Sequence, residues 1–342
     1  MRIAQVSPLW ETVPPPGYGG IELVVSHLTD ELVRRGHQVT LFASGDSTTI
    51  ATLESVVEEA VRLNPAVREP IAYDLLQWGR LEDMAGEFDL IHFHTGLIAL
   101  PFGKYLSTPF VHTLHGPFIP DNYKLFDRHR DQAFISISNA QRQGGPELNY
   151  ISTVYNGIST EDYPFVAEPE QDPPYLAFLG RLSPEKGPHR AIEIAKATGW
   201  RLKMAGKVDK TDKRFYEETI KPQIDGDQIQ YLGELSHEEK AELFGKATAT
   251  LFPIGWPEPF GLVMIESMCT GTPVIATEFG SVPEVVANDK TGFICSNLEE
   301  MIAAIPKAAE LKRQACRDYV EDFFSFAKMV DGYEAAYEKI IG

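Results

Sequence analysis

Short apolar segments alternate along this chain with longer segments of helical periodicity, and this alternation restricts the fold more than any other feature. The first strand candidate, Arg2–Val6, precedes a loop rich in Pro and Gly and a segment, Glu22–Arg35, with apolar residues at helical spacing. Apolar runs separated by helical patterns of about 10–15 residues are typical of βαβ units, which form parallel sheets. The other strand candidates are Gln38–Ala43, Leu90–Phe93, Phe110–Leu114, Ala133–Ile137, Thr153–Val154, Tyr175–Leu179, Arg201–Ala205, Ile229–Leu232, Ala249–Phe252, Pro273–Ala276 and Gly292–Ile294.

A change of composition divides this series in two. The segment Pro164–Pro174 is rich in Pro, Glu, Asp and Gln, which is typical of a linker. The 342 residues are enough for two domains of about 100–200 residues each. We therefore expect an α/β protein with two doubly wound, Rossmann-like domains, over residues 1–168 and 169–323. Because ligands bind such sheets at the carboxyl ends of the strands, we expect the site in a cleft between the two domains.

The charge and the cysteine content exclude several classes of protein. With 31 basic and 49 acidic residues the net charge is −18, which argues against general binding of nucleic acid or anionic lipid. Cys269, Cys295 and Cys316 form no C-x-x-C pair, which fits a reducing compartment and no disulfide framework. The sequence has neither a secretory signal nor a long uninterrupted apolar run, so we expect a cytoplasmic protein without stable membrane insertion. It carries no signal for the oligomeric state.

A glycine-rich loop, Gly17–Gly20, lies between the first strand candidate and the first helix candidate. Backbone amides at Gly19 and Gly20, together with the helix dipole, could hold a phosphate. The loop does not match G-x-G-x-x-G, because Glu22 stands where the third glycine would be. This mismatch weakens a dinucleotide interpretation and leaves a simple tight turn as the alternative.

A second loop, FLGRLSPEKG at residues 178–187, follows the first strand of the second domain. It contains Gly180 and two cations, Arg181 and Lys186. Arginine can bind phosphate oxygens with two parallel hydrogen bonds, and lysine acts as a point charge. In an acidic chain, two cations without evident partners favour binding of a diphosphate. The alternative is a surface salt bridge with Glu185.

The segment WPEPFGLVMIES at residues 256–267 carries two carboxylates. The prolines beside Glu258 favour an extended conformation there and a helix that begins near Phe260. Glu266 would then lie about 9 Å further along the helix. Free amides of Phe260, Gly261 and Leu262 would lie between the carboxylates, so the order of groups suits the hydroxyls and diphosphate of a sugar nucleotide. The alternative is that Glu266 is a buried capping or ion-pair residue.

Histidines alternate on two strand candidates, with His92 and His94 on one and His112 and His115 on or just after the next. Alternate histidines on one face of a strand can bind a metal, but no Cys, Asp or Glu at ligand spacing accompanies them. We therefore expect no metal site. His115, which precedes a glycine at the end of its strand, suits a hydrogen-bonding role toward the cleft. The other three we expect to be ordinary half-buried side chains.

Five segments, in this order along nearly the whole chain, resemble the successive motifs of the retaining glycosyltransferases of family 4, which have the GT-B fold. The segments are the glycine loop at 17–20, HTLHG at 112–116, VYNGI at 154–158, FLGRLSPEKG at 178–187 and EPFGLVMIE at 258–266. The seven-residue interval between Glu258 and Glu266 is the hallmark of that family. Residues 324–337 resemble its C-terminal helix, which crosses back to the first domain, so residues from about 324 to 342 would complete that domain.

The resemblance implies a role for each matching residue. Arg181 and Lys186 would neutralise the diphosphate leaving group, Glu258 would bind hydroxyls of the transferred sugar, and His115 would contact that sugar. Glu266 would bind the ribose hydroxyls. The remaining positions, implied to line the donor site, are Gly19, Gly20, Asn156, Gly180, Leu235, Phe260, Gly261 and Leu262.

The resemblance also implies the reaction: a hexose moves from a nucleoside diphosphate sugar to an acceptor hydroxyl on a small molecule or glycan, with retention and by substitution on the same face. No metal or other cofactor would be needed. Residues 7–47 further resemble a bacterial subgroup of UDP-glucose-dependent, pterin-type glucosyltransferases, which favours UDP-glucose as the donor. The alternatives are a UDP-sugar 2-epimerase of the same fold, a non-catalytic nucleotide-sugar-binding protein and, at the level of the fold, a nicotinamide dehydrogenase.

Overall fold

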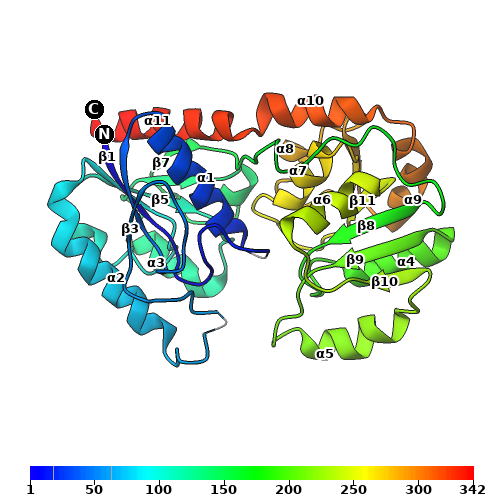
Figure 1. The fold of residues 1–342 in the computed structure, drawn as a ribbon, viewed down its shortest axis with the longest axis horizontal. Helices are drawn as coiled ribbons and strands as arrows, with labels where there is room; N and C mark the ends of the chain where they lie inside the picture. The colour runs from blue at the N-terminus through cyan, green and yellow to red at the C-terminus, as the bar shows by residue number, and fades with distance from the viewer. Residues whose placement is uncertain (18, 63) are drawn as a thin grey trace. The chain divides into compact units, whose positions relative to one another are not determined.

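The computed structural model describes residues 1–17, 19–62 and 64–342, and the chain forms two compact units (Figure 1). Unit 1 comprises Met1–Gly157 and Phe326–Gly342, and unit 2 comprises Ile158–Ser325. Tyr18, in the predicted glycine loop, lies outside the described residues. Each unit is built on a parallel sheet with helical connections, which confirms the two predicted Rossmann-like domains.

The described part of unit 1 contains a seven-stranded sheet with the order β3-β2-β1-β4-β5-β6-β7. The strands are β1 (Arg2–Val6), β2 (Gln38–Phe42), β3 (Thr52–Glu54), β4 (Leu90–Phe93), β5 (Phe110–Leu114), β6 (Phe134–Ser136) and β7 (Tyr150–Thr153). The order reverses between β1 and β4, which makes the carboxyl ends of these strands the topological switch point. The sequence did not predict β3, because three residues are too few to show a periodicity.

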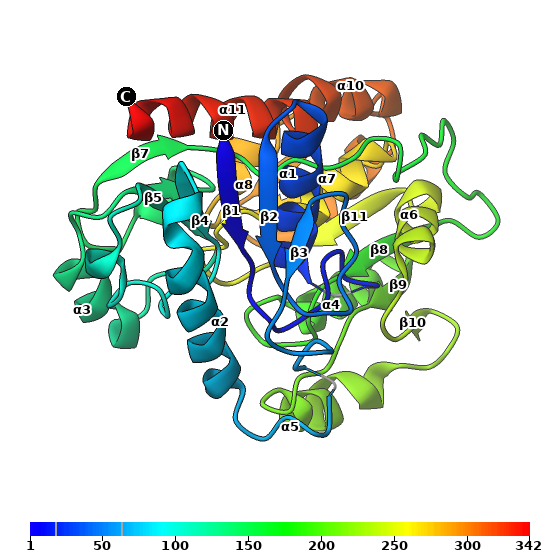
Figure 2. The ribbon, with the colours of Figure 1, turned by 60° about the vertical axis from the view of Figure 1, so that its left-hand side comes forward.

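Helices cover both faces of this sheet. They are α1 (Gly20–Arg34), α2 (Pro70–Met84), α3 (Pro120–Arg128) and α11 (Phe326–Ile341). One face packs apolar residues of β1 and β4 against α2. On the other face α11 lies along α1 (Figure 2). Arg35, just after α1, forms ion pairs with Asp331 and Glu334 of α11 at 2.8 and 2.6 Å, which attaches the C-terminal helix to this unit.

Residues 158–325, all of them described, form a six-stranded sheet with the order β10-β9-β8-β11-β12-β13. The strands are β8 (Tyr175–Leu179), β9 (Arg201–Ala205), β10 (Ile229–Tyr231), β11 (Ala249–Phe252), β12 (Val274–Thr277) and β13 (Gly292–Cys295). The helices are α4 (Pro188–Thr198), α5 (Lys213–Phe215), α6 (His237–Lys246), α7 (Leu262–Cys269), α8 (Val282–Val285), α9 (Leu298–Ala308) and α10 (Arg313–Phe323). The switch point lies between β8 and β11.

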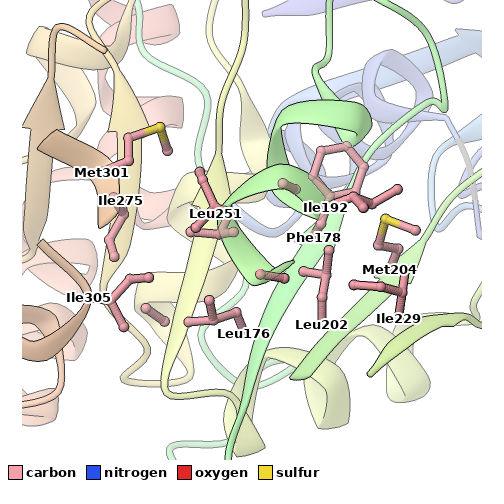
Figure 3. Close-up of a cluster of buried hydrophobic side chains, with 14 of the residues drawn as sticks. Leu176, Phe178, Ile192, Leu202, Met204, Ile229, Leu251, Ile275, Met301 and Ile305 are labelled. Carbon is pink, nitrogen blue, oxygen red and sulfur yellow. The ribbon is translucent and has the colours of Figure 1, made fainter. Parts of the chain in front are cut away.

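The core of unit 2 explains why these strands are readable from the sequence. Leu176, Phe178, Leu202 and Leu251 are fully buried between the sheet and its helices (Figure 3). Strands buried on both faces appear as nearly continuous apolar runs, which is the pattern that predicted them.

The crossing from unit 1 to unit 2 differs from the boundary expected at residue 168. The segment 158–168 belongs to unit 2 because it is bound to α7 and its C-terminus. Tyr163 donates a hydrogen bond to Glu266 at 2.7 Å, and the amide of Val166 donates to the carbonyl of Thr270 at 3.0 Å. The chain returns to unit 1 at Phe326, where α11 begins.

Candidate functional site

An ion pair spans the switch point of unit 2. Lys186, in the loop after β8, pairs through Nζ with Oε2 of Glu258, in the loop after β11. Trp256 donates from Nε1 to the same carboxylate oxygen at 2.9 Å, and its ring lies 4.9 Å from Lys186 Nζ. The Lys186 and Glu258 side chains are 21% and 10% exposed, so the pair is largely removed from water but still accessible to a ligand.

The backbone around Glu258 is fixed by a close approach of the loop after β12. The amide of Ser281 donates to the carbonyl of Glu258 at 3.0 Å. Gly280 has a φ of 56°, and a Cβ atom there would overlap the backbone of Glu258. Only glycine combines this backbone conformation with so close a contact. The position of Glu258 therefore depends on Gly280.

The second predicted cation, Arg181, lies among carboxylates. Its guanidinium contacts Glu185, Oδ2 of Asp209 at 3.4 Å and Oδ2 of Asp212 at 3.5 Å. Asp209 also pairs with Lys207, at 3.0 Å. Burial raises the pKa of Asp212 although Arg181 is nearby. Burial also disfavours the charged form of Glu185, but hydrogen bonds and the Arg181 guanidinium together hold its pKa below the ordinary value.

These contacts correct the expectation that the two cations lack partners. Arg181 does pair with Glu185, as in the alternative interpretation, but as part of a larger cluster, whereas Lys186 pairs with Glu258. Asp209 and Asp212 were not among the predicted site residues. A signal was available, since both follow β9, the strand beside β8, and the carboxyl ends of adjacent parallel strands lie at one edge of the sheet.

The helix expected from Phe260 begins instead at Leu262. Gly261 caps it with a left-handed φ of 76°, and the amide of Met264 donates to the carbonyl of Gly261 at 3.0 Å. Ser281 Oγ donates to the carbonyl of Phe260 at 2.7 Å. The amides of Phe260 and Gly261 therefore precede the helix, and its first turn starts two residues later than predicted.

Glu266 is buried inside α7. The hydroxyl of Tyr163 donates to Oε1 of Glu266 at 2.7 Å, whereas Oε2 has no hydrogen-bond donor among the described residues. Burial and the nearby Glu266 carboxylate raise the pKa of Tyr163 well above its ordinary value, so the phenol stays protonated and donates. Glu266 is thus buried, as in the alternative interpretation, but one of its oxygens is available to a ligand. No signal in the sequence indicated Tyr163.

Two further predicted positions in unit 2 have evident packing roles. The amide of Gly180 donates to the carbonyl of Ala205 at 3.1 Å, and a Cβ atom on Gly206 would overlap the carbonyl of Gly180. Leu235 precedes α6 and packs against the hydrophobic cluster around Tyr175. A role for Gly180 and Leu235 in donor binding stays a prediction.

In unit 1, Gly19 and Gly20 lie where α1 begins. Gly19 caps the helix with a φ of 138°, and a Cβ atom there would lie 2.7 Å from Cβ of Pro15. The loop therefore requires glycine at this position. Asn156 is buried, and in the described part of the chain its Oδ1 atom has no hydrogen-bond partner.

The histidines are more deeply buried than predicted. His92, His94 and His112 are fully buried rather than half-buried, and only His115 is partly exposed. Nε2 of His115 lies 2.9 Å from Nδ1 of His94. Burial lowers the pKa of His115 to about 3 and that of His112 to about 4, so both rings are neutral at neutral pH.

Across residues 1–17, 19–62 and 64–342, no group of three or more His, Cys, Asp or Glu side chains is placed to hold a metal ion. Nor does any helix within these ranges have the length and apolar character needed to cross a bilayer. The three cysteines are buried free thiols.

The chain has two Rossmann-like units. Unit 2 has an ion pair at its switch point, and the C-terminal helix completes unit 1. These features define a protein of the GT-B class. The profile of the family "Glycosyltransferase Family 4" matches residues 18–162, and that of "Glycosyl transferases group 1" matches residues 159–322. The chain is a glycosyltransferase of the GT-B type, in which the former profile covers the first domain and the latter profile covers the second.

Relatives and solved structures agree with this assignment. The chain is 27% identical to glycogen synthase from Mycobacterium tuberculosis, over 95% of this chain and 92% of that protein. It is 24% identical to D-inositol 3-phosphate glycosyltransferase from Mycobacterium bovis, over 100% and 84%. Sucrose-phosphate synthase from Thermosynechococcus elongatus superposes with a TM-score of 0.81 at 18% identity, over 99% and 98% of the chains. HepE from Anabaena, in complex with UDP and glucose, gives 0.76 at 18% identity, over 99% and 100%.

Proposed function

We propose that this glycosyltransferase moves glucose from UDP-glucose to a hydroxyl group of a small-molecule or glycan acceptor, with retention of the anomeric configuration. The observation that carries the proposal is the Lys186–Glu258 pair at the switch point of unit 2, beside the first turn of α7. In this pair, the ammonium group of Lys186 could bind a phosphate, and the carboxylate of Glu258, in contact with it, could accept hydrogen bonds from sugar hydroxyls. UDP-glucose is favoured because HepE, which has the same fold, binds it in its crystal structure.

In this reaction the bond between the anomeric carbon and the β-phosphate oxygen breaks, and negative charge develops on the departing UDP. Lys186 and Arg181 would stabilise that charge. Preorganised electrostatic stabilisation of this kind is usually the largest catalytic contribution. Because the diphosphate is itself anionic, it would compete with Glu258 for Lys186 and with Glu185, Asp209 and Asp212 for Arg181.

The other predicted residues would bind the uncharged parts of the donor. Oε2 of Glu266 would accept a hydrogen bond from a ribose hydroxyl, and His115 would contact the transferred sugar. No carboxylate is assigned as a nucleophile, so we propose substitution on the same face of the sugar, within an ion pair. The acceptor oxygen would bond to the anomeric carbon as the bond to UDP breaks, and the proton of the acceptor hydroxyl would pass to the departing β-phosphate oxygen. The two cations would supply the positive charge that Mg²⁺ provides in other transferases, so we propose that no metal is needed.

Two finer assignments belong to the same proposal. The likeness of residues 7–47 to pterin-type glucosyltransferases supports a soluble heterocyclic acceptor. The three free thiols support a cytoplasmic location, because reducing compartments keep cysteines unpaired.

The test begins with thermal shifts of the full chain in UDP, UDP-glucose, GDP-mannose, ADP-glucose, UDP-N-acetylglucosamine and NAD, with and without EDTA. A ligand at 100 times its Kd stabilises the folded state by about 2.7 kcal/mol, which is readily measured. We expect shifts with UDP and UDP-glucose that EDTA does not change. Proton NMR of the product then identifies the anomer. Donor consumption without acceptor would instead indicate an epimerase, and no shift with any nucleotide would refute the proposal.

A further inference from the structure

Polar side chains form one continuous hydrogen-bonded chain through the interior of unit 1. It starts at His115, after β5, and reaches Tyr337 on α11 before it returns to the sheet. The links are His115–His94 (2.9 Å), His94–Gln5 (2.9 Å), Gln5–Tyr337 (3.0 Å), Tyr337–His92 (2.7 Å) and His92–Thr113 (2.7 Å). Apart from His115, all of these side chains are fully buried. We call this set the histidine chain.

The sheet explains how these residues meet. Gln5 on β1 lies directly opposite His92 on β4, and β5 is the next strand. Their side chains point to the face that α11 covers, where Tyr337 lies between Gln5 and His92. Burying so many polar groups is costly unless each has a partner, and a satisfied buried network fixes one arrangement of its members.

Each histidine of the chain is uncharged. Burial lowers the pKa of His92 and His94 well below the ordinary value, and that of His115 to about 3. A neutral imidazole has one N–H donor and one acceptor nitrogen, so every ring must be in one of two tautomers. Which tautomer each ring adopts is decided by its neighbours.

The amide of Gln5 decides the direction. Its Oε1 atom can only accept, so Nε2 of His94 donates to it and Nδ1 of His94 is an acceptor. Nε2 of His115 must therefore donate to His94. On the other side Nε2 of Gln5 donates to the hydroxyl of Tyr337. The proton of that hydroxyl then has Nδ1 of His92 as its acceptor. Nε2 of His92 is therefore left to donate to Oγ1 of Thr113, which itself donates to the hydroxyl of Tyr333 at 3.3 Å. All donors point away from His115.

We propose that Gln5 and Tyr337 are positioning residues that hold His115 as the neutral Nε2–H tautomer, so that its Nδ1 atom faces the substrate as an acceptor. His115 would then bind a sugar hydroxyl that donates its proton, and it would give no proton to the leaving group. The sugar contact rests on the function proposed above, whereas the tautomer does not. The C-terminal helix thus determines the chemistry of a side chain at the end of β5.

The test compares Tyr337→Phe with Tyr150→Phe in the full chain, because both variants lose the same hydroxyl in the same unit. The hydroxyl of Tyr150 has no hydrogen-bond partner among the described residues. Nitrogen-15 shifts of labelled histidines, near neutral pH without ligand, report the tautomers. We expect pure Nε2–H at His115 in the wild type and in Tyr150→Phe. In Tyr337→Phe the Gln5 amide can rotate, so His115 adopts both tautomers.

A second variant tests the chain from its far end. Thr113→Val removes the acceptor of His92 Nε2–H. A buried N–H without an acceptor is costly, so His92 should change to the Nδ1–H tautomer. Each hydrogen bond between His92 and His115 would then reverse its direction. His115 would accept from His94 at Nε2 and become the Nδ1–H tautomer. The control is Thr108→Val, another buried threonine of unit 1, which donates to the carbonyl of Ala85 outside the chain. This variant should leave His115 unchanged.

Activity gives an independent result. We expect kcat/KM for UDP-glucose to fall about fivefold in Tyr337→Phe, the loss typical of one neutral hydrogen bond, and to stay unchanged in Tyr150→Phe. The proposal would be overturned if His115 were the Nδ1–H tautomer in the wild type. It would also be overturned if the histidine tautomers of both Tyr337→Phe and Thr113→Val were the same as in the wild type. If the tautomers change as expected but kcat/KM does not, the histidine chain stands and the contact of His115 with the sugar is refuted.

Discussion

Replacing Tyr163 with phenylalanine removes the hydroxyl that donates to Oε1 of Glu266 and leaves the aromatic ring in place. Tyr163 is 2% exposed and Glu266 4%, so water cannot readily take the place of the lost donor. A hydrogen bond to a charged group contributes about 1.5–3 kcal/mol. We expect the free energy of unfolding of unit 2 to decrease by this amount, which lowers the Tm by about 3–12 °C for a domain of this size.

The same substitution should weaken donor binding. Without Tyr163 the Glu266 carboxylate can rotate away from the position in which Oε2 meets a ribose hydroxyl. A loss of about 1.4 kcal/mol in binding corresponds to a tenfold change, so we expect the KM for UDP-glucose to rise about tenfold. The kcat should stay near the wild-type value, because the ribose contact is remote from the bond that breaks. Initial rates over a range of UDP-glucose concentrations measure both constants.

Tyr175→Phe is the matched control. Tyr175 is 1% exposed in the same unit, and its hydroxyl donates to the carbonyl of Leu243 at 2.8 Å, a neutral acceptor outside the site. We expect this variant to lose about 0.5–1.5 kcal/mol of stability and to keep its KM. An equal change of KM in both variants, or no change in Tyr163→Phe, would refute the orientation of Glu266 by Tyr163.

Three further perturbations test other parts of the structure. Arg181→Ala should lower kcat at saturating donor by about 10²-fold, and an unchanged kcat would exclude a role in stabilising the leaving group. Gly280→Ala should raise the donor KM, because the new Cβ atom would displace Glu258, whereas Gly226→Ala, with a positive φ of 78° but open space, should not. Unit 1 should lose stability as the pH falls from about 6.5 toward 3, because its buried histidines, such as His115, bind protons in this range only after unfolding. Each such histidine lowers the free energy of unfolding by up to ~1.4 kcal/mol per pH unit. Hydrogen exchange should then show unit 1 opening before unit 2, and the reverse order would contradict this reasoning.

Most strands of both sheets could be predicted from the sequence because the burial of each of these parallel strands is visible in its own residues. Tyr175–Leu179 and Ala249–Phe252 are strands with the predicted ends, since an apolar run shows its burial without reference to any other part of the chain. Arg201–Ala205, in which polar and buried residues alternate at its start, also has the predicted ends. The start of α7 was misplaced by two residues for the opposite reason. Pro259 indicated a start at Phe260, but the left-handed conformation of Gly261, packed against its neighbours, determines the cap.

The candidate site could be predicted as a set of residues but not as a set of contacts. Lys186 and Glu258 were both singled out, yet they lie 72 residues apart and their pairing depends on which loops meet at the switch point. Tyr163 directly precedes the segment with the composition of a linker, Pro164–Pro174, and its contact with Glu266 depends on the path of the chain along α7. Sequence patterns report the burial of single elements, whereas these contacts depend on how elements pack together.

The two kinds of polar contact in this protein suit two different tasks. The contacts of Arg181, whose side chain is 33% exposed, are partly solvated, and ion pairs of this kind contribute only about 0–1 kcal/mol. The Lys186–Glu258 pair is less exposed, at 21% and 10%. An anionic donor can therefore replace the carboxylates around Arg181 at little cost, and at Lys186 its phosphates would supply the negative charge that Glu258 gives up. Until the donor binds, the carboxylates keep both cations oriented. The histidine chain is neutral and, apart from His115, buried, so no ligand can replace the partners that its members have within the chain. We infer that the donor phosphates replace carboxylates as the partners of Lys186 and Arg181 on binding. The tautomer of His115, in contrast, is fixed by the fold before the donor binds.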